Sequence, residues 1–431
     1  MSIKLVTMLT MITESENKKN VMLPKTTVVK ITSSAISLDE VQYRMRRRKY
    51  SLTSPRIFES SPGYCQTTVI SGSKRFNFQQ LYSIDLDTLF PSSNEKYDII
   101  RKLSSGAYCS SYSIRDSVNN QIYLLKRYEL KNVSPKSSLG ENIYKRMHEE
   151  RRLLGALQSN YILTFISSFT EYDQDCYAIK FEYVTGVTLF HLLRRFRWLE
   201  EKAVCFYGAQ IVLALEYLHE LNIIYRNLKS ETILIGLNGY IKLCDFGFAT
   251  VLPNRESKTS TILGVPDYMP PEMLIGQPYS FSVDWWQLGV ILFELLTSMT
   301  PFFAREMFKT HVKTICLNRF EWPNRVSGMA RQIVKNLLNK EVSKRLGCTL
   351  SDASELKRNL WFQNNIEWTT LFDQQYPAPY KLKSLDPTNN ATILNSIESR
   401  RLEEYETTVQ ELTREDFDNN YTQDNKDQFE D

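Results

Sequence analysis

The segment Ser282–Thr297 constrains the fold more than any other part of the chain. Its sequence, SVDWWQLGVILFELLT, is apolar almost all round. A helix with apolar side chains on every face has no side to turn to solvent, so it must be buried. We therefore predict a central helix at residues 282–297, with other helices packed around it. One of these is predicted at Glu200–Leu221, where Ile211, Leu215 and Leu218 recur at helical spacing.

The chain before these helices has the character of a β-rich domain. Strands are predicted at Tyr97–Leu103, Ser111–Arg115, Gln121–Arg127, Ile162–Phe169 and Cys176–Tyr183. Between the third and the fourth lies one predicted helix, Asn142–Leu157, with Ile143 and Met147 four residues apart. The expected fold class is therefore α+β, with a small β-rich lobe and a large, mainly helical lobe that meet near Tyr183–Gly186. Ligands usually bind where two such units meet.

Composition and charge exclude several classes of protein. The hydrophobic share of 42% and the charged share of 24% are ordinary for a folded chain, and a net charge of +4 is small for 431 residues. Seven scattered cysteines without CxxC pairs predict neither a disulfide framework nor a zinc site. No run approaches the roughly 18 to 20 apolar residues of a membrane span. We expect a cytoplasmic protein with no membrane span and no nucleic-acid partner.

The two ends of the chain lack sustained hydrophobic periodicity. Residues 1–95 are rich in Ser and Thr and are predicted to form a basic, largely disordered extension, with one short helix around Phe78–Phe90. The basic residues are read most simply as a solvated linker, whereas a sharper interpretation makes Ser51, close after four consecutive cations, a phosphorylation site. Residues 363–431 become irregular, and 401–431 hold 11 acidic against 3 basic residues.

A series of short motifs follows one order through the middle of the chain. These are LSSGAYCSS at Leu103–Ser111, YLLK ending at Lys126, HEER containing Glu150, YRNLKSET at Tyr225–Thr232, DFG at Asp245–Gly247, PPE at Pro270–Glu272, DWW at Asp284–Trp286 and KRLG at Lys344–Gly347. Asn227 and Asp245 are 18 residues apart. Each motif alone is weak evidence, but their order and spacing together leave little room for coincidence.

The series resembles the catalytic domain of AGC-class serine/threonine protein kinases, nearest to the cAMP-dependent kinases, over about residues 97–362. The resemblance implies the two-lobed protein-kinase fold. Its boundaries are a kinase domain at 96–362, an N-lobe at 96–185, a C-lobe at 186–362 and an AGC-like tail at 363–431. It also implies that Arg345 and Glu272 form a buried ion pair.

The resemblance also implies which residues bind ATP and Mg²⁺. Lys126, paired with Glu150, would hold the α- and β-phosphates under a loop that contains Gly106. The base would lie among Leu103, Ser111, Glu182, Val184 and Leu234. Asp245 and Thr232 stand at the metal positions, and Asn227, Lys229 and Glu231 lie in the catalytic loop.

Four departures from the family pattern bear on that chemistry. Asn227 replaces the aspartate that accepts the substrate proton, and a carboxamide cannot accept a proton at neutral pH. General-base help contributes about 100- to 10,000-fold to a rate. Thr232 replaces an asparagine metal ligand, and only Gly106 of three loop glycines remains. Ser111 and Leu124 replace the valine and alanine above the base. These changes weaken the expectation that ATP and Mg²⁺ bind.

Three functions stay open on the sequence. A pseudokinase that serves as scaffold or allosteric partner in signalling is favoured, because the altered groups all serve one reaction. The rival is a weakly active or atypical ATP-dependent serine/threonine kinase acting on basic substrates. The third is a nucleotide sensor without turnover. Glu231 and Glu294 match acidic residues that receive substrate arginines, whereas Thr188 replaces a third.

One regulatory residue is expected and one partner is disfavoured. Thr261 matches the activation-loop phosphosite of the family, with Arg226 as the cation that binds the phosphate. Ser260 stands where the closest relatives have a tryptophan that docks the cAMP-binding regulatory subunit. Val265 replaces a threonine that contacts the catalytic loop. We therefore expect protein partners or basic peptides, and the sequence argues against the regulatory subunit as a partner.

Overall fold

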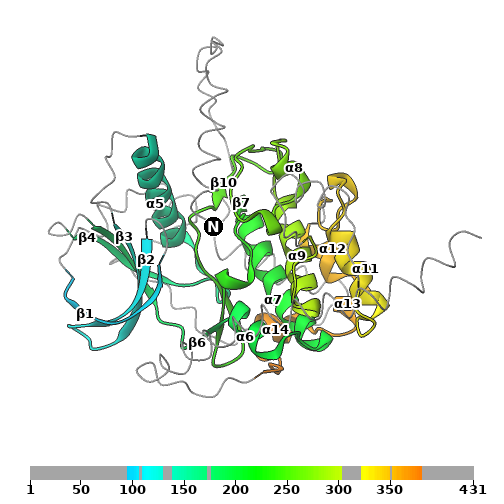
Figure 1. The fold of residues 1–431 in the computed structure, drawn as a ribbon, viewed down its shortest axis with the longest axis horizontal. Helices are drawn as coiled ribbons and strands as arrows, with labels where there is room; N and C mark the ends of the chain where they lie inside the picture. Colours follow the sequence, from blue (N-terminus) through cyan, green and yellow to red (C-terminus); the bar gives the residue numbers. More distant parts are fainter. Residues whose placement is uncertain are drawn as a thin grey trace, which may run out of the picture. The chain divides into compact units, whose positions relative to one another are not determined.

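Five antiparallel strands form one sheet in the N-terminal part of the fold (Figure 1). They are β1 (Tyr97–Ser105), β2 (Cys109–Asp116), β3 (Ile122–Glu129), β4 (Phe165–Glu171) and β5 (Cys176–Glu182), in the order β1-β2-β3-β5-β4. The computed structural model describes residues 95–105, 109–129, 138–171, 176–302, 322–349 and 352–380. Gly106, Ser51, the helix predicted at Phe78–Phe90 and most of the acidic tail lie outside these residues.

The strand predictions are confirmed for all five segments, with one correction. The fourth strand begins at Phe165 and not at Ile162, because Ile162 forms a parallel bridge with Leu243 in another sheet. Helix α5 (Ser138–Ala156) contacts β4 and buries Ile143 and Met147, as the spacing predicts, but it begins four residues before the predicted start.

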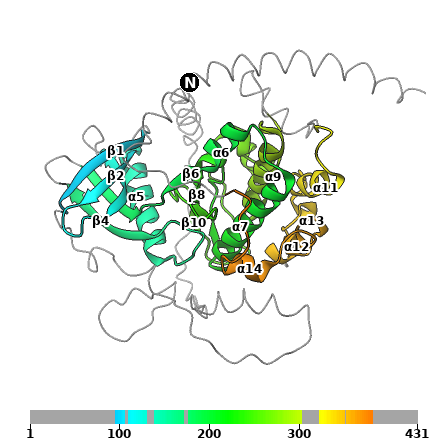
Figure 2. The same ribbon diagram turned by 90° about the horizontal axis from the view of Figure 1, so that it is seen from below.

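Helices dominate the C-terminal part. The longer ones are α6 (Leu189–Phe196), α7 (Glu201–Glu220), α9 (Ser282–Thr297) and α11 (Gly328–Leu337), and the shorter ones are α8 (Pro271–Leu274), α12 (Ala353–Lys357), α13 (Leu360–Gln363) and α14 (Trp368–Phe372). Helix α9 has the predicted bounds, lies between α7 and α11 (Figure 2), and is buried along nearly its whole length. Gly289 allows the close crossing, since a Cβ there would lie 2.8 Å from Leu337 Cβ. No helix among the described residues is long and apolar enough to cross a membrane.

Short strands and turns place the catalytic loop between the sheet and the helices. They are β6 (Gly186–Thr188), β7 (Ile223–Ile224), β8 (Ile233–Gly236), β9 (Ile241–Leu243) and β10 (Thr250–Val251), with the 3-10 turns η2 (Ser230–Thr232), η3 (Pro266–Tyr268) and η4 (Val342–Lys344). Strand β6 approaches β8 so closely that a Cβ on Gly186 would lie 1.8 Å from the carbonyl oxygen of Ile235. The loop from Tyr225 to Thr232 is thereby held between β7 and β8.

The predicted ion pair between Arg345 and Glu272 is present and buried. Arg345 Nη1 lies 2.6 Å from Glu272 Oε1, and Nη2 lies 2.9 Å from Oε2. The same guanidinium donates to the carbonyl oxygen of Ser282 at 3.0 Å, at the start of α9. Because the Arg345 side chain has 0% exposure, this bidentate pair links α8, α9 and the segment after α11 inside the core.

A second buried cluster surrounds His219 on α7. Its Nε2 lies 2.9 Å from Asp284 Oδ2, and its Nδ1 lies 3.3 Å from Asp352 Oδ1. Asp352 also accepts from Trp285 Nε1 and from Arg255 Nη1, each at 2.8 Å. Burial acts to lower the pKa of His219, but Asp352 and Asp284 outweigh burial and raise the pKa to about 9. His219 is therefore an imidazolium at neutral pH.

The Arg345–Glu272 pair yields a prediction for stability. Arg345→Met is expected to lower the free energy of unfolding by roughly 3 to 5 kcal/mol, because Glu272 stays buried without its cation. Adding Glu272→Leu removes the stranded charge and is expected to recover most of the loss. Urea unfolding of the three proteins measures both effects. A single variant as stable as the parent would contradict the prediction.

The His219 cluster yields a pH prediction. A folded pKa of about 9 against an ordinary value of 6.5 gives stability that is full below pH 6.5 and lost as the pH rises to 9. His219→Gln carries no charge, so its stability is expected to fall less over that window, by roughly 2 to 3 kcal/mol. Unfolding curves recorded across the window test this difference. Parallel pH profiles for the two proteins would show that His219 is not charged in the fold.

Candidate functional site

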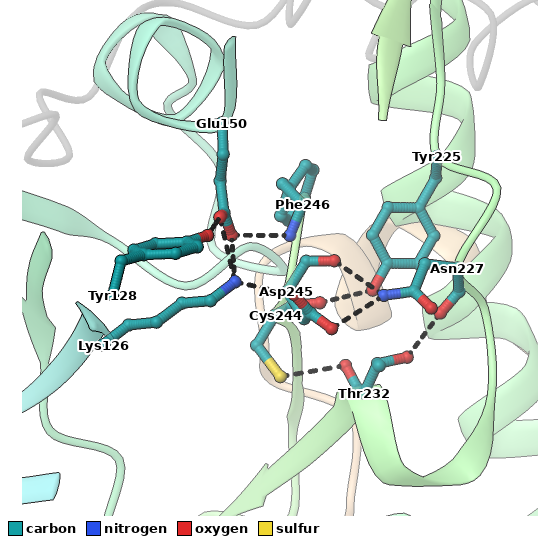
Figure 3. A network of polar contacts seen from close by, with 9 residues as sticks. All are labelled: Lys126, Tyr128, Glu150, Tyr225, Asn227, Thr232, Cys244, Asp245 and Phe246. Atoms are coloured by element: carbon teal, nitrogen blue, oxygen red, sulfur yellow. Dashed lines mark hydrogen bonds and ion pairs between the residues drawn. The ribbon is translucent and has the colours of Figure 1, made fainter. Parts of the chain in front are cut away.

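Lys126 and Glu150 form an ion pair across the N-terminal part (Figure 3). Lys126 lies on β3 and Glu150 on α5, and Lys126 Nζ is 2.8 and 2.9 Å from the two carboxylate oxygens. The Glu150 side chain has 0% exposure and that of Lys126 has 12%. The resemblance to AGC kinases implies this pair, and the structure contains it. The role of Lys126 in binding phosphates stays a prediction.

Tyr128 is a member of this network that the motifs did not reveal. Its hydroxyl donates to Glu150 Oε2, and its ring centroid is 5.3 Å from Lys126 Nζ. Burial and the charge of Glu150 raise the pKa of Tyr128 well above its usual value, so the hydroxyl keeps its proton. The backbone N–H of Phe246 also donates to Glu150, at 3.2 Å. Strand alternation offered the signal, since Tyr128 and Lys126 are two residues apart on one face of β3.

Asp245 is held from two sides by groups that are far apart in the sequence. Lys126 Nζ lies 2.8 Å from Asp245 Oδ1, and Asn227 Nδ2 lies 3.0 Å from Oδ2. The same amide nitrogen donates to the backbone oxygen of Asp245 at 2.9 Å. Burial acts to raise the pKa of Asp245, but Lys126, Asn227 and Lys229 together hold it below its ordinary value. Asp245 is thus an ionised carboxylate whose two oxygens both accept hydrogen bonds.

Thr232 is turned into the catalytic loop. Its hydroxyl oxygen lies 2.8 Å from the carbonyl oxygen of Asn227 and 3.0 Å from that of Lys229. It also accepts from the Lys229 N–H at 3.3 Å. The residue is 3% exposed, so its hydroxyl serves to brace the loop.

The Thr232 position does not fit a magnesium ligand, and Asp245 already has two protein partners. Mg²⁺ requires oxygen ligands in near-octahedral geometry. Oδ1 of Asp245 faces an ammonium, Oδ2 faces an amide N–H, and the Thr232 oxygen is occupied by the loop backbone. A cation at Oδ2 would meet the positive end of the amide dipole of Asn227. Thr232 is therefore committed to the loop, whereas the Asp245 side chain is 45% exposed and keeps acceptor capacity for a ligand.

The residues predicted around the base lie on β1, β2, β3, β5 and β8, except Val184, which lies between β5 and β6. Ser111, Leu124, Val184 and Leu234 are all partly exposed, and Leu103 is 42% exposed. Glu182 is different, because its carboxylate is used by Lys242 at 2.7 Å and by the Thr164 N–H at 2.8 Å. That pairing lowers the pKa of Glu182 against the effect of burial. One carboxylate oxygen of Glu182, Oε1, therefore joins β5 to β9 through Lys242.

The acidic residues predicted to receive arginines differ in exposure. Glu231 is exposed, whereas Glu294 is 7% exposed and accepts from Tyr268 at 2.8 Å and from Ser230 at 3.1 Å. Burial, with the nearby charge of Glu231, raises the pKa of Glu294 to about 7. Thr188 caps α6 by accepting from the His191 N–H at 3.2 Å. Among these positions in the described chain, Glu231 alone is both exposed and acidic.

Thr261 is exposed and linked to Arg226 through Tyr279. The Tyr279 hydroxyl donates to the carbonyl oxygen of Thr261 and accepts from Arg226 Nη1 at 3.2 Å. Arg226 also donates to the carbonyl oxygen of Phe248 at 2.7 Å. Arg146, which the motifs did not reveal, stacks over the Phe248 ring at 5.4 Å, and burial and the charge of Arg226 lower its pKa. Arg226 is therefore linked to the predicted phosphosite through Tyr279, and Arg146 lies near Arg226.

Comparison with known proteins now identifies the family. Residues 97–362 match the protein kinase domain model. The chain is 34% identical over 295 residues to the cAMP-dependent protein kinase type 3 of Saccharomyces cerevisiae, covering 68% of this chain and 71% of that relative. This chain is an AGC-class member of the protein kinase family. The cAMP-dependent protein kinase catalytic subunit 2 of Drosophila melanogaster is 31% identical over 76% of this chain and 89% of its own length.

A third relative is a kinase with another name. The ribosomal protein S6 kinase beta of Caenorhabditis elegans is 35% identical over 67% of this chain and 51% of that protein. The kinase fold predicted from the motifs is thereby confirmed, with the five-stranded sheet and α5 as its N-lobe and the helical part as its C-lobe.

The cations near Thr261 yield a prediction. Phosphothreonine placed at position 261 by site-directed incorporation is expected to raise the melting temperature by roughly 2 to 4 °C. The added negative charge would offset the repulsion between Arg146 and Arg226, which is linked to Thr261 through Tyr279. Arg146→Gln is expected to remove part of that gain. Phosphoserine at Ser260 is the matched control, since it adds the same charge one residue away. Equal gains at the two positions would contradict a specific site for the Thr261 phosphate.

Proposed function

We propose that this kinase-family chain is a pseudokinase, which acts as a scaffold or allosteric partner in signalling and transfers little or no phosphate. The observation that carries the proposal is the orientation of Asn227. Both bonds of its amide nitrogen go to Asp245, one to the carboxylate and one to the backbone oxygen. A group bound in this way donates hydrogen bonds and cannot accept the proton of a substrate hydroxyl.

The altered residues and the retained residues fall into different parts of the molecule. Asn227 and Thr232, at positions where the reaction needs an acceptor and an oxygen ligand, are bonded to the protein itself. The pairs Lys126–Glu150 and Arg345–Glu272, which hold elements together, are intact. This division supports a protein that keeps the kinase fold but has lost the phosphate-transfer step.

A weakly active or atypical ATP-dependent serine/threonine kinase is the alternative. The observation in its favour is the assembled arrangement of Lys126, Glu150 and Asp245, which joins the two lobes as a transfer reaction would require. Lys229 is retained in the catalytic loop, and the exposed Glu231 remains available to a basic peptide. A nucleotide sensor without turnover would use the same lysine.

The partners of such a scaffold are expected to be proteins, in the cytoplasm. Ser260 is exposed and small, so it supplies no aromatic side chain for docking a regulatory subunit. Basic peptides are the expected ligands under the alternative, with Glu231 as the acidic residue that receives them.

Phosphate transfer by the purified full chain tests the proposal. With labelled ATP, Mg²⁺ and a basic serine peptide, the wild type is expected to match Lys126→Ala, because both lack a working reaction centre. Asn227→Asp with Thr232→Asn is expected to raise transfer above that background by roughly 100-fold or more, the lower range for a general base. Wild-type transfer that Lys126→Ala abolishes would overturn the pseudokinase proposal in favour of the weak kinase.

The same experiment separates the causes of inactivity. If the double reversion restores no transfer, the altered residues around the base become the first explanation for inactivity. Ser111→Val and Leu124→Ala are then added to the doubly reverted protein, and transfer is measured again. A melting temperature raised by ATP without any turnover supports the nucleotide sensor. The control is Thr188→Ser, a conservative change at a helix cap, which is expected to leave each result unchanged.

A further inference from the structure

Lys242 on β9 makes an ion pair that crosses from the C-lobe to the N-lobe. Its Nζ lies 2.7 Å from Oε1 of Glu182, the last residue of β5, and 3.5 Å from the carbonyl oxygen of Ile162. The same Oε1 atom accepts from the N–H and from the hydroxyl of Thr164, at 2.8 and 2.5 Å. Donors from two separate segments therefore meet at one carboxylate oxygen, directly before the joint between the lobes at Tyr183–Gly186.

The segment at residues 161–164 gives this ion pair a fixed backbone frame. The Leu163 N–H donates to the carbonyl oxygen of Leu243 at 2.9 Å, and the Leu243 N–H donates back to the same segment at 2.8 Å. On the other side, the Glu182 N–H donates to the carbonyl oxygen of Thr164 at 3.0 Å. The segment is thus bonded to both β5 and β9. A rotation of β5 away from β9 would have to break these contacts or stretch the ion pair.

The lobes make another contact at a separate point of the sheet. Lys126 on β3 lies 2.8 Å from Asp245, three residues after Lys242. The strand register places Lys126 opposite Ile179, and Glu182 follows three residues further along β5. At about 3.4 Å per residue, the two anchor points on the backbone of the sheet are roughly 10 Å apart. One contact between two bodies leaves them free to rotate about it, whereas two separated contacts also fix the angle between them.

We propose that Glu182 and Lys242 form a lock across the joint, which together with the Lys126–Asp245 contact holds the lobes at one angle without a bound ligand. Both members of the lock carry charge, because Lys242 and Thr164 hold the pKa of Glu182 below its ordinary value against the effect of burial. Their side chains are 31% and 23% exposed, so water and salt screen the pair in part and the lock can open.

The inference goes beyond the proposed function, because it holds whether or not phosphate is transferred. For a scaffold, its consequence is that a binding surface spanning both lobes keeps its shape without nucleotide. For a kinase, its consequence is that a ligand requiring another angle must first break the ion pair. Glu182 and Lys242 are positioning residues in both cases, since they act through the arrangement of the lobes.

Hydrogen–deuterium exchange of the full chain without nucleotide tests the lock. In Lys242→Gln the Glu182 carboxylate keeps Thr164 but loses its cation, so the lobes are expected to separate more often. Exchange of the backbone N–H groups in residues 161–165 and 182–186 is expected to become roughly 3- to 5-fold faster, in the range for a partly exposed ion pair. Exchange in α9, inside the C-lobe, is expected to stay at the wild-type rate.

Matched variants separate the ion pair from the loss of a cation. Lys242→Arg keeps the charge and is expected to exchange like the wild type. Lys258→Gln removes an exposed cation from another part of the C-lobe and should leave both segments unchanged. Glu182→Gln keeps an oxygen for Thr164 and is expected to act like Lys242→Gln, and the double variant should be no faster than either, since both changes break one contact. If Lys242→Gln does not fold, the comparison of Glu182→Gln with the wild type decides the question.

Three results would overturn the lock. Wild-type exchange in both segments of Lys242→Gln would show that the pair does not hold the lobes. An equal acceleration in α9 would show that the change loosens the whole fold and not the joint. Additive effects of the two single variants would place Glu182 and Lys242 in separate contacts. Phosphate transfer by the wild type, in contrast, overturns only the proposed function.

Discussion

The buried carboxylate of Asp284 holds the reaction centre of this fold in place. It accepts from the backbone N–H groups of Tyr225 at 2.9 Å and Arg226 at 2.8 Å, and from His219 at 2.9 Å. Because Asp284 lies in the first turn of the buried helix α9, the catalytic loop is fixed to the core of the C-lobe. Arg226 adopts a backbone φ of 61°, a strained conformation that such contacts sustain. The directions of Asn227 and Thr232 depend on this anchor.

Retained and altered residues of the kinase motifs contact one another, since Asp245 bonds to both Lys126 and Asn227. The loop that Asp284 anchors carries an amide where a base is expected, and that amide bonds to Asp245. The lobes are joined at the same point, since Lys126 on β3 reaches both Glu150 and Asp245. The contacts that join the lobes thus do not depend on an aspartate at position 227. A binding function can use the joined lobes without phosphate transfer.

Charge placement explains how the altered site remains stable. Removing a catalytic carboxylate from a centre that already holds Glu150 and Asp245 lowers the local repulsion, and the amide adds two hydrogen bonds in its place. Tyr128 contributes a further donor to the fully buried carboxylate of Glu150. The surroundings of Thr261 differ, because Arg146 and Arg226 lie together there, and an added phosphate would relieve their repulsion.

The sequence by itself determined the fold and the pairs that span fixed spacings. The all-apolar segment at 282–297 predicted α9 to the residue, and the ordered motifs predicted the family and the pairs Lys126–Glu150 and Arg345–Glu272. Only the tertiary structure decided that the Asn227 amide nitrogen points to Asp245 and that the Glu182 carboxylate pairs with Lys242. The reason is physical: periodicity and motif order are local properties of the chain, whereas these hydrogen bonds join residues on separate elements whose rotamers depend on packing. The start of β4 was missed for the same reason, because pairing with Leu243 draws Ile162 into another sheet.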